Sequence, residues 1–97
     1  MNVGTCKIHL RLPENGTLKD KRQVSRSLMA RVRNKFNVCI AEVDNNDAHQ
    51  LLTLGVACVS NDARHANQML SKVMDFIQTQ QGDTEVLDYE MDIMTGV

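Results

Sequence analysis

The stretch Val3-Gly4-Thr5-Cys6-Lys7-Ile8-His9-Leu10-Arg11-Leu12 alternates between polar and apolar side chains from Thr5 onward. The apolar members that share one side are Cys6, Ile8, Leu10 and Leu12. The polar members on the other side are Thr5, Lys7, His9 and Arg11. A period of two residues is typical of a β-strand that buries one face. The sequence therefore predicts a half-buried strand over residues 3–12.

The next predicted element is a helix. The segment Pro13 to Gly16 interrupts the strand pattern, and the side chain of Thr17 can accept a hydrogen bond from the first turn of a helix that starts there. Apolar residues then recur at helical spacing, on one stripe that faces a core. They are Leu18, Val24, Leu28, Val32 and Phe36. We therefore expect a helix from Thr17 to about residue 35.

The middle of the chain predicts a β-hairpin. Residues 37–44 and 51–60 are short runs rich in Val, Ile, Cys and Leu, and the segment Asp44 to Asp47 between them holds residues that favour turns. Residues 51–59 are apolar on both faces, so this strand is expected at the centre of a sheet.

A second helix and a last strand complete the chain. Asn61 and Asp62 can cap a helix that runs through Gln80, and Gly82 is expected to end it. Residues 85–94 alternate again. The apolar side of this last strand is expected to hold Leu87, Tyr89, Met91 and Ile93. The polar side is expected to hold Asp88, Glu90 and Asp92.

The predicted order β-α-β-β-α-β is that of the ferredoxin-like fold, an α+β architecture with two helices on one face of a four-stranded antiparallel sheet. Right-handed crossovers place the first and third strands in the centre, the fourth beside the first and the second beside the third. A chain of 97 residues has the size of one domain. We therefore expect a single domain over residues 1–97, with the second face of the sheet uncovered.

The net charge of −1 conceals two halves of opposite sign. Residues 1–41 hold nine Lys or Arg against two acids, whereas residues 42–97 hold two Lys or Arg against ten acids. Such asymmetry marks a polyanion-binding face unless the charges meet and cancel across the fold.

Most of the cations belong to the first predicted helix. Four of them, Lys19, Arg22, Arg26 and Arg33, fall within about 60° of one another on a helical wheel. Arg31 and Lys35 flank the opposite edge of the apolar stripe, while Lys21 falls near its middle and must extend past it or sit at the helix end. Cations repeated on one side of a helix displace counterions from a nucleic-acid backbone. The hypothesis is phosphate contact with RNA or a ribosomal particle through Lys19, Lys21, Arg22, Arg26 and Arg33; the alternative is a solvated helix face.

The uncovered sheet face lacks the aromatic side chains on which RNA bases stack, since the chain holds one Tyr, two Phe and no Trp. The acids of the last strand are expected to meet the cations of the first as cross-strand pairs. Those acids repel phosphate. A face of mixed apolar and paired charged residues can instead serve a protein partner, so the alternative to RNA binding is a protein-interaction module or a homodimer.

No motif of a catalytic site is present. The sequence lacks a G-x-x-x-x-G-K-[ST] loop, a C-x-x-C pair and a nucleophile elbow. Acylphosphatases share the expected topology and length, but Pro13 to Gly16 does not supply their Arg-containing, glycine-rich anion loop. Asp44, Asp47 and His49 could ligate a metal, yet their spacing fits no standard site. We therefore expect a protein that is not an enzyme and has no cofactor or metal, with an unknown enzyme as a third alternative.

The sequence predicts a cytoplasmic protein without a membrane partner. No apolar run approaches the roughly 20 residues that span a bilayer, and the first residues lack the basic leader and apolar run of a secretory signal. Cys6, Cys39 and Cys58 lie far apart in apolar segments, which suits a reducing compartment.

Three segments resemble the YlxP family of small bacterial proteins over nearly the whole chain. They are Thr17-Leu18-Lys19-Asp20-Lys21-Arg22, where the family usually has Ser-Leu-Lys-x-Lys-Arg, Phe36 to Val43, and Leu54 to Asn61. The resemblance implies a ferredoxin-like fold, a bacterial cytoplasmic setting and a gene neighbourhood shared with translation initiation and ribosome maturation factors. It implies no established activity and no catalytic residue.

Overall fold

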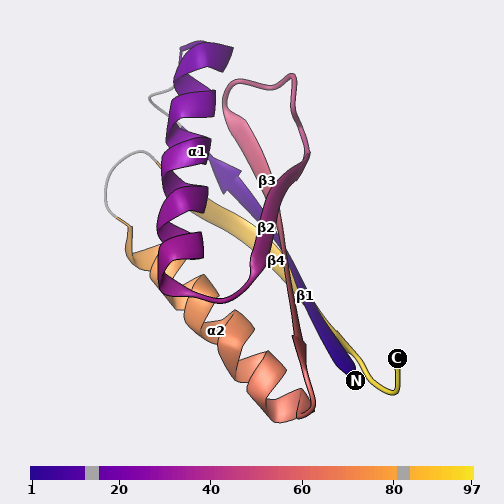
Figure 1. Cartoon of the computed structure of the whole chain (residues 1–97). Helices are drawn as coiled ribbons and strands as arrows, with labels where there is room; N and C mark the ends of the chain where they lie inside the picture. Colours follow the sequence, from indigo (N-terminus) through magenta and orange to yellow (C-terminus); the bar gives the residue numbers. More distant parts are fainter. Residues whose placement is uncertain (13–15, 81–83) are drawn as a thin grey trace.

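Six helices and strands follow one another in the computed structural model, which describes residues 1–12, 16–80 and 84–97 (Figure 1). In chain order they are β1 (Asn2–Arg11), α1 (Leu18–Lys35), β2 (Cys39–Asp44), β3 (Leu51–Ser60), α2 (Ala63–Thr79) and β4 (Glu85–Met94). This order confirms the expectation from the sequence. Two expected features, the interruption at Pro13 to Asn15 and the helix end at Gly82, lie outside the described residues.

The four strands form one antiparallel sheet in the order β2-β3-β1-β4. β1 and β3 pair along their full length, from Asn2 opposite Ser60 to Arg11 opposite Leu51. Both helices lie on the same side of the sheet, and no described element covers the other side (Figure 1). The fold is therefore the predicted ferredoxin-like α+β arrangement, with β1 and β3 in the centre.

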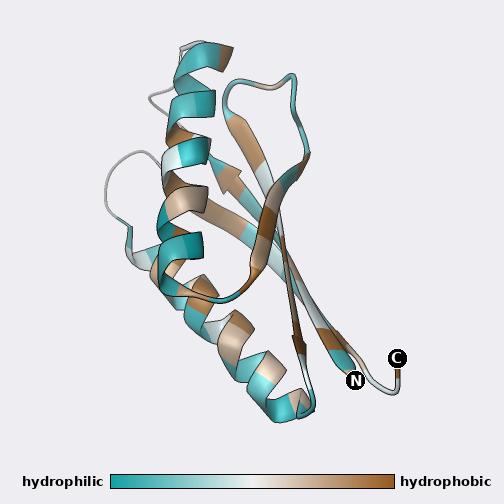
Figure 2. Cartoon of the chain, viewed as in Figure 1, coloured by the Kyte–Doolittle hydropathy of each residue, from teal (hydrophilic) through white to brown (hydrophobic). Residues whose placement is uncertain are grey.

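The core lies between the sheet and the helices. Ile8 and Leu10 of β1 and Leu12 just after it have at most 1% of their surface exposed, and they belong to one core cluster with Leu70 and Ile77 of α2. Each such side chain contributes about 1.5–3 kcal/mol on full burial. α2 packs against β1, β3 and β4, whereas α1, the more hydrophilic helix in Figure 2, packs against β2 and α2. Neither helix, within the described ranges, is long and apolar enough to cross a lipid bilayer.

Both helices begin at a side chain that caps their first turn. The hydroxyl of Thr17 accepts a hydrogen bond from the main-chain N–H of Asp20 at 3.0 Å. The carboxylate of Asp62 accepts one from the N–H of Arg64 at 2.8 Å. Each cap of this kind contributes about 1 kcal/mol. These contacts confirm the helix starts that the sequence predicts.

The last strand departs from the expected alternation. A β-bulge shifts the register between β1 and β4 after His9. Val86 packs against the core together with Met91, while Leu87 is 50% exposed and Tyr89 48%. The expectation that Leu87 belongs to the core-facing side was wrong, because the bulge adds a residue that a strict period of two does not allow for.

Lys21 lies inside the protein, with 1% of its surface exposed. It shares the buried stripe of α1 with Ser25, Leu28 and Val32, which recur at spacings of three and four residues. The expectation that Lys21 contacts phosphate was therefore wrong, because its ammonium group faces the protein interior.

Three oxygen atoms surround that ammonium group. Lys21 Nζ donates to the main-chain carbonyls of Asn45 at 2.5 Å and Ala48 at 2.7 Å, and it lies 2.8 Å from Glu42 Oε1. The contact with Glu42 is an attraction between charges rather than an aligned hydrogen bond. Glu42 belongs to β2 and the two carbonyls to the β2–β3 connection, so Lys21 joins the start of α1 to the edge of the sheet.

We expect Lys21→Met to lower the free energy of unfolding by about 3–5 kcal/mol, because it leaves the largely buried Glu42 carboxylate without its cation. Adding Glu42→Leu should restore most of the loss, since no unpaired charge then remains. Urea denaturation measures both effects. As a control, Lys19→Met changes an exposed lysine of the same turn and should alter stability by less than about 0.5 kcal/mol. Equal stabilities of the two lysine variants would contradict the assignment.

Candidate nucleic-acid interface

Four exposed cations line one flank of α1, and we name this set the basic flank: Lys19, Arg22, Arg26 and Arg33. Of the residues that the structure describes, none places a carboxylate oxygen within 4.0 Å of these side chains. Arg33 donates from Nη2 to the main-chain carbonyl of Ile40 at 2.9 Å, a contact that leaves its charge unneutralised. Four of the five predicted phosphate contacts therefore share one exposed flank, and Lys21 lies apart from them.

Arg31 and Lys35 lie on the opposite flank of α1, as the sequence predicts. Arg31 donates to the main-chain carbonyl and the hydroxyl of Ser27 and to the side-chain carbonyl of Gln80, the C-cap of α2. Lys35 Nζ lies 4.9 Å from the centroid of the Phe76 ring in α2. The flank toward α2 is therefore occupied by contacts within the protein, and the basic flank faces away from α2.

The order of the strands explains why the acidic half of the chain does not neutralise the basic flank. α1 packs on β2 at one edge of the sheet, and the acids of β4 lie at the other edge. Three strand spacings of about 4.8 Å separate the two edges by about 14 Å, more than the screening length of about 8–10 Å at physiological salt. Glu42, an acid of β2 beside α1, is already bound by Lys21. The two halves of the chain thus neutralise each other at Lys21–Glu42 and Arg11–Glu85, whereas the basic flank stays unpaired among the described residues.

The open face of the sheet carries the cations of β1 beside the acids of β4. Arg11 Nη2 lies 2.6 Å from Glu85 Oε2, and His9 Nε2 lies 3.8 Å from Glu90 Oε2. These contacts confirm the cross-strand pairing expected for Glu90 and add Glu85 to it. The β4 side of this face therefore repels phosphate rather than attracting it.

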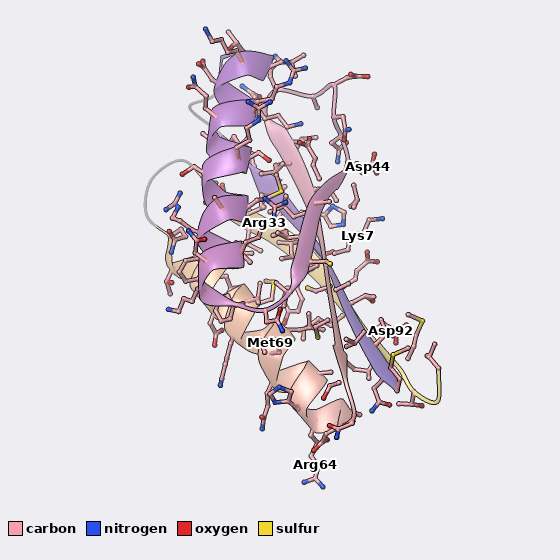
Figure 3. All side chains as sticks on the ribbon, in the orientation of Figure 1. Lys7, Arg33, Asp44, Arg64, Met69 and Asp92 are labelled. Atoms are coloured by element: carbon pink, nitrogen blue, oxygen red, sulfur yellow. The ribbon has the colours of Figure 1, made fainter. Side chains whose placement is uncertain are left out.

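The middle of the open face holds a shallow hollow of about 540 Å³ to which all four strands contribute. Its small side chains are Thr5, Cys39, Ala41, Gly55 and Ala57. Lys7 and Asp92, which also line it, point away from the helices (Figure 3). The expectations from the sequence did not include this hollow. The sequence pattern that could have predicted the hollow is the set of small residues at positions 39, 41, 55 and 57. The register of β2 and β3 places these residues side by side.

The described residues hold neither a metal cluster nor a reactive buried thiol. No group of three or more His, Cys, Asp or Glu within residues 1–12, 16–80 and 84–97 could hold a metal ion, so Asp44, Asp47 and His49 form none. Burial raises the pKa of the Cys6 thiol to about 11 and also raises the pKa of Cys58, which keeps both thiols protonated at neutral pH.

Comparison with known proteins gives one family and one relative at useful similarity. Residues 3–91 match the family model described as Protein of unknown function (DUF503). The uncharacterized protein YlxP of Bacillus subtilis (strain 168) is 34% identical over 77 residues, which cover 79% of this chain and 84% of that protein.

A solved structure, a REP-associated tyrosine transposase bound to a REP hairpin, superposes with a TM-score of 0.45 at 10% identity. The superposition covers 99% of this chain, which spans 58% of the transposase chain.

The family model covers most of the chain, and the relative agrees with the resemblance carried by the segment Thr17 to Arg22. The chain therefore belongs to the YlxP family, described as Protein of unknown function (DUF503).

Proposed function

We propose that this protein binds RNA, either free or within a ribosomal particle, through the basic flank of α1. The observation that carries the proposal is the exposure of four cations on one flank with no described carboxylate within 4.0 Å. Binding a polyanion to such a flank releases counterions from the nucleic acid, which favours association at moderate salt. This function requires no catalytic group.

The basic flank has the length of a short stretch of nucleic-acid backbone. A rise of 1.5 Å per residue separates Lys19 from Arg33 by about 21 Å along the helix axis. A duplex strand with one phosphate per roughly 3 Å of axis offers about six or seven phosphates over that length. One backbone can therefore engage all four cations at once.

The basic flank supplies contacts to phosphates rather than to bases. Recognition of single-stranded bases relies on stacking against aromatic side chains. The two Phe side chains, Phe36 and Phe76, pack against each other between α1 and α2, with ring centroids 5.7 Å apart. We therefore expect binding that depends strongly on salt and on RNA shape and weakly on sequence.

Arg22→Ala and Arg26→Ala should each flatten the slope of log K against log salt by about 0.7 to 0.9, because each removes one phosphate contact. The slope is measured by titrating a ribosomal RNA fragment between about 50 and 200 mM salt. Alanine preserves the helix, so the fold is retained. Arg31→Ala, on the opposite flank, is the matched control and should leave the slope unchanged. An equal effect of all three variants, or no RNA binding by the wild type at low salt, would refute the proposal.

In a cell lysate we expect the protein to migrate with ribosomal subunits at low salt and to be released at high salt, because phosphate contacts weaken as salt rises. Sucrose-gradient sedimentation followed by detection of the protein measures this distribution. The Arg22→Ala, Arg26→Ala double variant should leave the ribosomal fractions at lower salt than the wild type. Wild-type protein that stays free of those fractions at every salt would exclude the ribosomal particle as the partner.

The hollow on the open sheet face favours a second candidate function, that of a protein-interaction module. A homodimer through this face predicts a mass that rises with protein concentration in analytical ultracentrifugation, because association follows mass action. A monomer mass at high concentration would argue against the homodimer.

A further inference from the structure

We propose that the open sheet face is a docking site for a basic amphipathic helix of another protein, whose apolar side chains enter the hollow. This face is separate from the basic flank of α1. The proposal stands whether or not that flank binds RNA.

The centre of the face is shaped to receive apolar side chains. The hollow of about 540 Å³ is lined mainly by small residues of β1, β2 and β3. The glycine at position 55 leaves room for the Val43 side chain that lines the hollow, because a Cβ atom there would lie 2.8 Å from Val43 Cγ1. Large apolar side chains are exposed on the same face toward either end of β3, with Val43 52% and Val59 67% exposed. Exposed apolar side chains gathered around a hollow are typical of an interaction site.

The side of the hollow toward β4 is acidic. Four acids of β4 share this face: Glu85, Asp88, Glu90 and Asp92. β1 contacts two of them through Arg11 and His9. In the part of the chain that the structure describes, no cation lies within 4.0 Å of Asp88 or Asp92. Lys7 also lines the hollow, so this face sets Lys7 and Arg11 against the four acids of β4. A ligand in the hollow therefore meets an excess of negative charge, which repels phosphate and attracts Lys or Arg.

In the two simple arrangements of a second copy, no cation comes to lie opposite those acids. In a closed face-to-face dimer, the two-fold axis lies between the two sheets. An axis along the strands places β4 of one copy over β2 of the other, whose open-face residues are Cys39, Ala41 and Val43. An axis across the strands places β4 over β4 and brings the acids together. The charge complementarity therefore favours a partner of different, basic chemistry.

A helix matches the dimensions of the face. The edge strands β2 and β4 are about 14 Å apart, and a helix with its side chains is about 10–12 Å wide. One side of an amphipathic helix presents apolar residues at spacings of three and four, with charged residues along their border. The apolar row enters the hollow while the basic border lies over β4.

The test compares two matched amphipathic peptides of about 18 residues, one built from Leu and Lys and the other with Glu at every Lys position. Fluorescence anisotropy of a dye on the peptide measures binding to the full chain. We expect the Leu–Lys peptide to bind and the Leu–Glu peptide to bind at least about tenfold more weakly. The bound Leu–Lys peptide should also slow the reaction of Cys39 with a thiol reagent, because this exposed cysteine lines the hollow whereas Cys6 and Cys58 are buried.

Two variants locate the site. Ala57→Leu fills the hollow, and Asp92→Lys reverses one charge beside it; each should weaken binding of the Leu–Lys peptide by about tenfold or more. Arg22→Ala, on the basic flank, should leave peptide binding unchanged and serves as the matched control. The salt slope of RNA binding is measured on the same variants, so that failure of this proposal is distinguished from failure of RNA binding.

Three results would overturn the proposal. The first is that the Leu–Lys peptide does not bind or binds no better than the Leu–Glu peptide. The second is that its binding survives both substitutions, with the fold of each variant checked by circular dichroism. The third is a concentration-dependent mass of the wild type that Ala57→Leu abolishes, because a second copy of the chain would then occupy the face.

Discussion

The buried stripe of α1, with Lys21 at its start, determines which side of the helix faces the solvent. Lys21 is surrounded by the Glu42 carboxylate and the carbonyls of Asn45 and Ala48, so this side of the helix must face β2. The basic flank then lies about 120° around the helix from the buried stripe, at a spacing of 100° per residue. In the sequence, the family motif from Thr17 to Arg22 is a run of basic residues, but in the fold these basic residues have two different roles. Lys21 holds the helix in place, and Lys19 and Arg22 present charge to the solvent.

Much of this fold follows from local sequence patterns. The alternation in residues 3–12 and the caps at Thr17 and Asp62 act over a few residues, and each predicts its element correctly. The basic flank is also predictable, because a helical wheel needs only the sequence. The burial of Lys21 is not, because its partners lie 21 to 27 residues further along the chain and meet it only in the folded protein. The inner position of Val86 depends on a bulge between strands at opposite ends of the chain, and the hollow depends on the register of a hairpin.

Because of the strand order, the basic flank of α1 and the acids of β4 form two separate surfaces of opposite charge. Because β2 and β4 are the two edges, the cations over one edge and the acids on the other are too far apart to neutralise each other. The two proposed surfaces have opposite charge, and neither proposal requires the other.

The hydrogen bond from Arg33 to Ile40 has a consequence for the behaviour of the sheet edge. β2 is an edge strand, and an uncovered edge is a template for pairing with strands of other chains, the first step of many aggregation processes. The Arg33 guanidinium covers the Ile40 carbonyl at this edge. An incoming strand would have to displace that side chain and approach a row of positive charge. Arg33, one of the four cations of the proposed RNA surface, is therefore expected also to hinder strand pairing at this edge.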